Sequence, residues 1–236
     1  MFIRSPRLDY IDGCETTLGG LGGDEAMRLY LSSMKFGDRF ADLVAMAGRS
    51  ARVAVISNAT DFIPDASRQA YARTVFDAAR QFNDAGLNAE NLDLRDFFDG
   101  AGDLHAALAD VDVLWVNGGN TFLLRRALRQ SGLDDLVRRR VRDGSLLYAG
   151  WSAGAVVAGP SLVGADLMDD PNQIADRYRP EPIWEGLGLT PFVVIPHFDS
   201  DHAESALAAA MARLMAQKAI PYRVLRDGEV LIVDQA

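Results

Sequence analysis

Short apolar runs rich in β-branched residues alternate along this chain with longer segments of helical periodicity. The runs 52–60 and 111–119 end in small or polar residues, as buried strands of a parallel sheet do, and 145–151 is a third apolar run of this kind. The segments between them, such as 65–86 and 120–144, carry apolar residues at helical spacing, and 120–144 is either one helix or two helices broken near Gly132. This alternation predicts a three-layer α/β/α fold with a mostly parallel sheet and right-handed crossovers.

The two ends of the chain add to this pattern. Residues 24–34 have a helical pattern, and 203–220 has the pattern of an amphipathic helix. The stretch 222–234 predicts a C-terminal β-hairpin that turns at Asp227-Gly228. No Pro- or Ser-rich linker divides the chain, so we expect a single domain over residues 1–236.

Composition excludes several classes of function. A net charge of −9 argues against a protein that mainly binds nucleic acid or an anionic membrane. The single cysteine, Cys14, forms no intramolecular disulfide, which favours a cytoplasmic location, and no strand-to-turn pattern around it suggests catalysis. Three histidines without metal-ligand spacing predict no metal and no cofactor. Apolar residues near the N-terminus are compatible with a homodimer, which the pattern does not require.

The stretch LYAGWSAGAVVAG, residues 147–159, places a serine among very small residues. Residues 150–154 match G-x-S-x-G, a strained strand-to-helix turn that lifts the serine out of a sheet. A strand pattern precedes the motif and an Ala/Gly/Val helix pattern follows it. We therefore predict that Ser152 is a nucleophile, against the alternative of a small-residue turn that only packs on the sheet.

A serine nucleophile requires a general base and an oxyanion site. His197 ends the apolar run 189–198, which predicts a strand, so it is better placed at a sheet edge than His105 or His202. Gly118-Gly119 and the amide of Ala153 are the candidate oxyanion donors. The glycine pair is equally compatible with a plain turn in which Asn120 or Thr121 caps the next helix, and both interpretations can hold together.

The pattern alone does not select the acid that orients the histidine. Carboxylates follow both the nucleophile and the base, and two more flank the final turn. The candidates are Asp166, Asp169, Asp170, Asp199, Asp201, Asp227 and Glu229.

Four stretches, VNGGNTFLLRRAL, YAGWSAGAVVAG, IPHF and YRVLRDGEVLIV, resemble in this order the serine peptidases of the peptidase E (aspartyl dipeptidase) family, which includes cyanophycinase. The resemblance runs from about Val53 to the C-terminus. It implies a fold similar to class I glutamine amidotransferases, with serine in place of their cysteine. It also implies that Ser152 is the nucleophile, His197 the base, and Gly119 and Ala153 the oxyanion donors.

The chain departs from the family at the third catalytic position. The family has a glutamate in a Leu-x-Glu-Gly context, and Asp227 takes that place here. Because aspartate is one methylene shorter, Glu229 and Asp166 remain alternatives to it. We favour Asp227.

A second departure concerns the substrate. Aspartyl dipeptidases carry an arginine after the histidine that helps to bind an acidic side chain, whereas here no arginine lies between His197 and Arg213. Asp199 and its acidic neighbours would repel an acidic substrate, so specificity for an N-terminal aspartate is open. Arg177 and Arg179, in the irregular segment 159–189, are candidate replacements, with solvated loop arginines as the alternative. The candidate substrate-binding residues are Asn120, Thr121, Asp199, Arg177 and Arg179.

Together these features predict a serine exopeptidase, dipeptidase-like, that hydrolyses short peptides through a Ser-His-Asp/Glu triad and an acyl-enzyme. We expect the segment 159–189 to cover the site and to restrict it to small peptides. Two alternatives stay open: an esterase or amidase that acts on a non-peptide acyl group, and a non-catalytic binding domain that keeps the elbow geometry.

Overall fold

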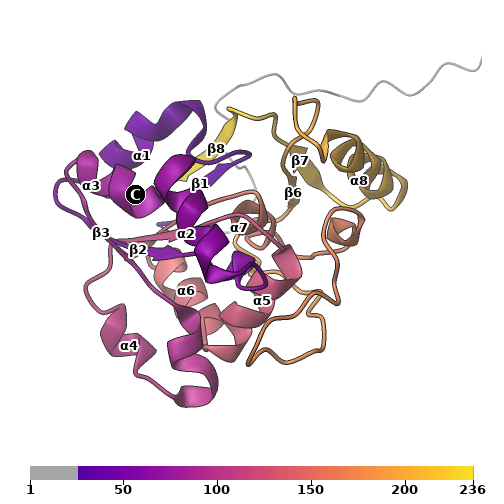
Figure 1. Cartoon of the computed structure of the whole chain (residues 1–236). Helices are drawn as coiled ribbons and strands as arrows, with labels where there is room; N and C mark the ends of the chain where they lie inside the picture. The colour runs from indigo at the N-terminus through magenta and orange to yellow at the C-terminus, as the bar shows by residue number, and fades with distance from the viewer. Residues whose placement is uncertain (1–25, 236) are drawn as a thin grey trace, which may run out of the picture.

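The computed structural model describes residues 26–235. Its centre is a six-stranded sheet in the order β3-β2-β4-β5-β1-β8, parallel throughout except for β8, which runs antiparallel to β1 (Figure 1). A separate parallel pair consists of β6 and β7. The strands are β1 (Arg28–Ser32), β2 (Arg52–Ile56), β3 (Asn88–Asn91), β4 (Val113–Val116), β5 (Leu147–Trp151), β6 (Val193–Ile195), β7 (Tyr222–Val224) and β8 (Val230–Asp234).

Helices cover both faces of the sheet, which confirms the predicted three-layer arrangement. One face carries α5, α6 and α7, and the other packs against α1 and α3 around Phe36, Phe82 and Trp115. The α-helices are α1 (Phe40–Ala47), α2 (Asp65–Thr74), α3 (Ala78–Asp84), α4 (Leu104–Ala107), α5 (Thr121–Gln130), α6 (Leu133–Arg142), α7 (Ala153–Val156) and α8 (Ser205–Gln217), and the 3-10 helices are η1 (Gly37–Arg39), η2 (Asn58–Thr60), η3 (Leu94–Gly100) and η4 (Ala165–Leu167).

The register of the parallel strands determines where the site lies. Gly150 of β5 is opposite Val116 of β4 on one side and Leu31 of β1 on the other. The carboxyl ends of these three strands therefore meet at one edge of the sheet. Ligands of open α/β sheets bind at this edge.

The helical prediction for residues 24–34 is wrong, because this segment contains β1, an inner strand of the sheet. Tyr30 lies in the apolar cluster on one face, whereas Leu29 and Leu31 lie in the cluster on the other, and all three are fully buried. A strand buried on both faces reads as a continuous apolar run, which periodicity cannot separate from a helix.

The predicted C-terminal hairpin is also wrong. A tight turn exists, since the Glu229 amide donates to the Arg226 carbonyl at 2.9 Å, but it carries the chain from one sheet to another. β7 pairs with β6, whereas β8 pairs with β1. β8 pairs with β1 through five residues, whereas β7 has only three residues with which it could pair.

Two helical predictions are refined by the structure. The segment 65–86 forms two helices, α2 and α3, because the chain leaves the helical conformation at Val75 and the Asp77 carboxylate caps α3 at the Arg80 amide. The segment 120–144 breaks at Gly132, whose φ of 76° ends the helical course between α5 and α6.

Two buried arginines of α5 hold the irregular segment 159–189 against the domain. Arg126 donates to the carbonyls of Pro171 at 2.6 Å and Pro180 at 2.7 Å. Arg125 donates to the Glu185 carbonyl at 2.6 Å and forms a bidentate pair with Asp134. A segment without regular secondary structure thereby acquires fixed partners for its backbone.

None of the helices within the described residues has the length and hydropathy that a membrane crossing requires. Cys14, for which the sequence suggests no catalytic role, lies outside the described residues.

Candidate active site

Ser152 occupies a strained turn between β5 and α7. Its φ of 48° and ψ of −115° are unusual for a residue with a side chain. A Cβ atom on Gly154 would lie 2.3 Å from the Val116 carbonyl oxygen, and one on Gly150 would lie 3.0 Å from the Gly154 backbone. The small residues are therefore what allows strand and helix to approach closely enough to form the elbow.

The structure brings Ser152, His197 and Asp227 together in one line. The Nε2 atom of His197 lies 3.1 Å from Ser152 Oγ, and its Nδ1 atom lies 2.7 Å from Asp227 Oδ1. His197 follows β6, and Asp227 lies in the turn between β7 and β8. With a proton on Nδ1, the imidazole donates to the carboxylate and accepts the serine hydroxyl, which is the arrangement a general base needs.

Ser33 is a member of the site that the sequence analysis missed. Its hydroxyl donates to Asp227 Oδ1 at 2.8 Å and accepts the backbone N–H of His197 at 2.7 Å. It therefore fixes the carboxylate and the histidine backbone together. The signal that could have identified it is the polar pair Ser32-Ser33 at the end of an apolar run, which the helical prediction concealed.

The two alternative acids bond elsewhere. The Glu229 carboxylate accepts the Arg226 amide at 2.8 Å, and Asp166 Oδ1 accepts the Gly164 amide at 3.1 Å. The Asp227 amide donates to Ser200 Oγ at 2.8 Å, which holds its turn beside the histidine. Only Asp227 of the three contacts His197 among the described residues.

The candidate oxyanion donors have free amides. Among residues 26–235, no group accepts a hydrogen bond from the backbone N–H of Gly119 or of Ala153. Gly119 has a φ of 136°, and its turn is held by the Asn120 amide, which donates to the Ala59 carbonyl at 2.9 Å. Two unpaired amides flanking the serine are the feature that an oxyanion hole requires.

Gly119→Ala should lower both activity and stability. A Cβ atom there would lie 2.6 Å from the Ala59 carbonyl oxygen, so the turn must shift and move the amide. We expect kcat to fall by about 10²-fold or more, as for loss of one oxyanion donor. Gly48→Ala is the matched control, because Gly48 also has a positive φ but open space around it. Equal effects of both substitutions on kcat would contradict the role of the Gly119 amide.

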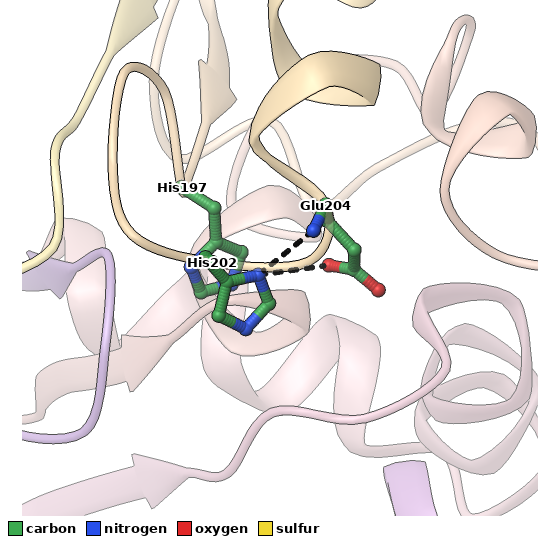
Figure 2. Close-up of side chains that lie close together, drawn as sticks. All are labelled: His197, His202 and Glu204. Atoms are coloured by element: carbon green, nitrogen blue, oxygen red, sulfur yellow. Dashed lines mark hydrogen bonds and ion pairs between the residues drawn. The ribbon is translucent and has the colours of Figure 1, made fainter.

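His202 and Glu204 adjoin His197 (Figure 2). The His202 ring stacks on that of His197 with centroids 3.8 Å apart and planes 10° apart. The Glu204 amide donates to His202 Nδ1 at 3.2 Å, and its carboxylate lies 4.0 Å from the same atom. The sequence pattern placed His202 only in a loop or first helical turn and gave no sign of this stacking.

The same three residues could in principle hold a metal ion. Their ligand atoms lie within 4.8 Å of one another, and imidazole and carboxylate are zinc ligands. However, lone pairs of parallel imidazoles do not converge on one point, and both nitrogens of His197 already face Ser152 and Asp227. The geometry therefore favours a catalytic histidine supported by a second ring.

Burial controls the ionisation of this site. It lowers the pKa of His197, with a further lowering by His202, against the opposing effect of the Asp227 carboxylate. Burial also raises the pKa of Asp169 and of Glu204, and the charge of Asp169 raises that of Glu204 further. Burial thus favours the neutral form of His197, and it disfavours the charged forms of Asp169 and Glu204.

The lowered pKa of His197 predicts the pH profile. With the neutral imidazole of His197 in its predicted role as general base, kcat/KM should fall as the pH drops through the pKa of His197, at a value below the ordinary 6.5. His202→Ala should move this midpoint upward, because His202 lowers the pKa of His197 and its ring helps to bury that of His197. The check is kcat/KM measured from about pH 4 to pH 8. A midpoint above 6.5 in the wild type would contradict the burial effect.

Three of the predicted substrate-binding residues, Asn120, Thr121 and Asp199, already have hydrogen-bond partners within the protein. Asn120 caps α5 by accepting the Leu123 amide at 2.9 Å, and the buried Thr121 donates its amide to Asp169 at 2.9 Å. Asp199, exposed near His197, accepts a hydrogen bond from Arg226 at 2.8 Å. These contacts leave their predicted roles toward a substrate untested.

Arg177 and Arg179 are not brought to the site, contrary to the prediction. The Arg179 amide donates to the side chain of Gln130, the last residue of α5, and its guanidinium pairs with Asp99 at 2.6 Å. The Arg177 carbonyl accepts from Gln130 as well. The N-terminal end of α5 faces the site, and ten helical residues span about 15 Å, so both arginines lie at the far end.

Comparison with known proteins identifies the family of this chain. The profile of peptidase family S51 matches residues 43–236. The chain belongs to this family. A peptidase E of Streptomyces coelicolor is 31% identical over 195 residues, which cover 79% of this chain and 76% of that protein. A Drosophila melanogaster protein named as a probable alpha-aspartyl dipeptidase is 32% identical over 174 residues, or 71% of this chain and 65% of that protein.

Solved structures show the same fold. A candidate peptidase E from Listeria monocytogenes EGD-e superposes with a TM-score of 0.66 at 22% identity, over 89% of this chain and 99% of that one. A peptidase from an acI-B1 Actinobacterium superposes with a TM-score of 0.63 at 16% identity, over 89% and 84% of the two chains. The S51 chain described here is thus a serine peptidase with the peptidase E fold.

Proposed function

We propose that this S51 peptidase is an exopeptidase of the dipeptidase type that hydrolyses short peptides through an acyl-enzyme. The observation that carries the proposal is the line from Ser152 Oγ through the His197 ring to Asp227 Oδ1, with distances of 3.1 and 2.7 Å. Support also comes from the Drosophila melanogaster relative, whose name describes a dipeptidase.

In the proposed mechanism, Ser152 Oγ attacks the peptide carbonyl while His197 Nε2 takes its proton. The amides of Gly119 and Ala153 stabilise the negative oxygen of the tetrahedral intermediate. His197 then gives the proton to the leaving amine, and a water molecule, activated by the same histidine, hydrolyses the acyl-enzyme. Asp227 holds the imidazole in the required tautomer. No step of this sequence calls for a metal or an organic cofactor.

Two carboxylates support a substrate with a free amino group. Glu204 lies beside His202, and Asp169 is held at the amide of Thr121. The charge of Asp169 raises the pKa of Glu204, burial raises the pKa of both, and no arginine or lysine is among the groups that shift either pKa. A substrate α-ammonium would supply the missing positive charge, which suits an exopeptidase.

The test is hydrolysis of free dipeptides beside N-acetylated dipeptides and p-nitrophenyl esters. We expect the free dipeptides to be preferred by about tenfold or more in kcat/KM, since blocking the amine removes its charge. Faster turnover of the esters than of every dipeptide would instead favour an esterase. Glu204→Gln should raise KM for free dipeptides more than for acetylated ones. A cytoplasmic location and a homodimer remain predictions from the sequence.

A further inference from the structure

The structure contains a cavity of about 750 Å³ between α2 and the carboxyl ends of β2 and β4. From β2 the chain continues outward to β3, whereas β4 leads in the opposite direction to β5. Crevices at such a switch of direction are the usual ligand sites of open α/β sheets. The volume also lies within the range of small-molecule sites.

The cavity is continuous with the catalytic centre. Gly118, Gly119 and Trp151 line it, and a Cβ atom on Gly118 would lie 3.0 Å from the Cβ of Ser152. It opens on the β4 side of the nucleophile, whereas His197 reaches Ser152 from the β1 side through Ser33. The leaving amine must adjoin His197, so the cavity can receive only the acyl side of the substrate.

One wall of the cavity is apolar, and α2 contributes to it without joining the packed core. α2 buries none of its residues, yet Tyr71 and Ala72 of this helix line the cavity. Phe76 and Trp151 meet there edge to face, with ring centroids 6.0 Å apart. α2 therefore covers an apolar hollow. A large side chain that enters this hollow would remove water from its own apolar surface and from that of the wall.

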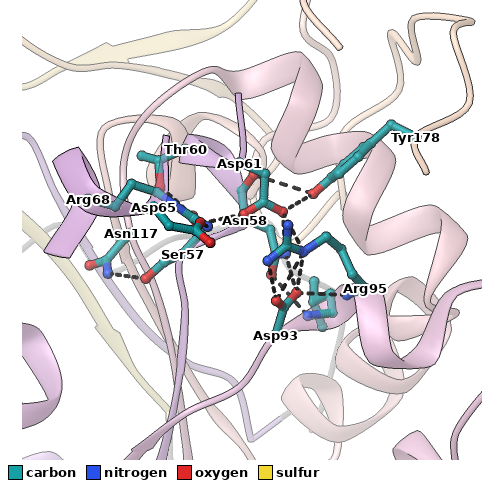
Figure 3. Close-up of polar contacts among 11 residues, drawn as sticks. Ser57, Asn58, Thr60, Asp61, Asp65, Arg68, Asp93, Arg95, Asn117 and Tyr178 are labelled. Carbon is teal, nitrogen blue, oxygen red and sulfur yellow. Dashed lines mark hydrogen bonds and ion pairs between the residues drawn. The ribbon is translucent and has the colours of Figure 1, made fainter. Parts of the chain in front are cut away.

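The other wall is charged, and its arginines are already paired (Figure 3). Arg95 contacts Asp93 at 3.0 Å and Asp61 at 3.4 Å, and Arg68 contacts Asp61 at 2.7 Å and also pairs with Asp65. Hydrogen bonds from Arg95 and Asn58 outweigh burial and hold the pKa of Asp93 at about 2, so it is ionised. The charged residues that line the cavity are four aspartates, Asp61, Asp65, Asp77 and Asp93, and these two arginines.

We propose that this cavity binds the side chain of the substrate's acyl-side residue, and that it takes large neutral or basic side chains and rejects acidic ones. The excess of two carboxylates repels an acidic group, and the apolar wall accommodates an aromatic ring or the stem of a lysine. The proposal rests on the peptidase function above. The substrate's α-ammonium and side chain would then lie toward opposite faces of the sheet edge.

The first test compares X-Leu dipeptides with X = Phe, Lys, Ala and Asp. In the wild type we expect Phe and Lys to exceed Asp by about tenfold or more in kcat/KM. Ala72→Phe fills the cavity and should remove the advantage of X = Phe over X = Ala. Ala70→Phe, on the exposed side of the same helix and outside the lining, should preserve it.

A second pair of variants tests the charge. Asp65→Asn releases one contact of Arg68 and removes a carboxylate, so X = Asp should improve several-fold relative to X = Phe. Asp84→Asn removes a similar exposed carboxylate, paired with Arg80 on α3, and should change nothing. A wild-type preference for X = Asp would overturn the proposal and would point to Arg68 Nε, which is buried without a partner among the described residues.

Binding separates this proposal from the proposed function. The same dipeptides are titrated into Ser152→Ala, which holds substrate without turning it over, with and without Ala72→Phe. Selective binding of X = Phe that Ala72→Phe abolishes supports the cavity even if the wild type hydrolyses no dipeptide. If Ala72→Phe and Ala70→Phe affect hydrolysis equally for every X, the proposed role of the cavity is overturned. The peptidase function is not affected by that result.

Discussion

Ser152→Ala should abolish peptide hydrolysis while leaving the fold intact. The serine hydroxyl lies 3.1 Å from His197 Nε2, and no other hydroxyl contacts that ring atom among the described residues. Alanine is as small as the turn requires, so the neighbouring glycines keep their contacts. We expect kcat to fall by about 10⁴-fold or more, since the nucleophile and its proton transfer are both lost.

Labelling by a fluorophosphonate measures the same residue independently of any substrate. The wild type should react at Ser152, as located by mass spectrometry of the labelled peptide, and Ser152→Ala should not react. Ser145→Ala, in the exposed turn before β5, is the matched control and should label like the wild type. Undiminished turnover by Ser152→Ala, with an unchanged melting temperature, would remove this residue from the mechanism.

Asp227→Asn should have the second largest effect. An amide of the same size keeps a partner for Ser33 but loses the negative charge that stabilises the imidazolium in the transition state. It also allows the histidine to adopt the wrong tautomer. We expect kcat to fall by about 10³- to 10⁴-fold with a smaller change in KM.

Two variants make this result specific. Glu229→Gln alters the neighbouring carboxylate of the same turn, which bonds to the Arg226 amide and not to His197, and should stay within about threefold of the wild type. Asp227→Glu restores the charge with one more methylene and should recover part of the activity. A larger loss in Glu229→Gln than in Asp227→Asn would transfer the orienting role to Glu229.

The local pattern around Ser152 was sufficient to predict the elbow. Its geometry depends on glycines at positions 150 and 154 and on a strand followed directly by a helix, and all of these are visible in the sequence. The end of an apolar run likewise placed His197 at the sheet edge, although β6 belongs to a separate pair of strands. Features set by neighbours in the chain are readable because their physical cause is local.

Other features depend on partners distant in the chain. The sequence of β1 has a helical pattern, and only its pairing with β5 and β8 shows that it is a strand. The role of Ser33, which follows this strand, was therefore not predicted either. The loop that carries Arg177 and Arg179 docks on the far end of α5, and no local pattern in the sequence indicates this contact. The periodicity of apolar residues indicates which residues are buried, but it does not indicate which part of the chain they pack against.

The sequence by itself determined the α/β class, the nucleophile turn and the residue types of the triad, because each follows from short-range sterics or from side-chain chemistry. The tertiary structure alone decided which of several carboxylates faces His197, since Asp227, Glu229 and Asp166 differ in their surroundings rather than in their chemistry. It also decided that β8 pairs with β1 instead of forming the expected hairpin, and that α2 covers a cavity beside Gly119. Such contacts join residues far apart in the chain, and the local pattern carries no information about the distance between them.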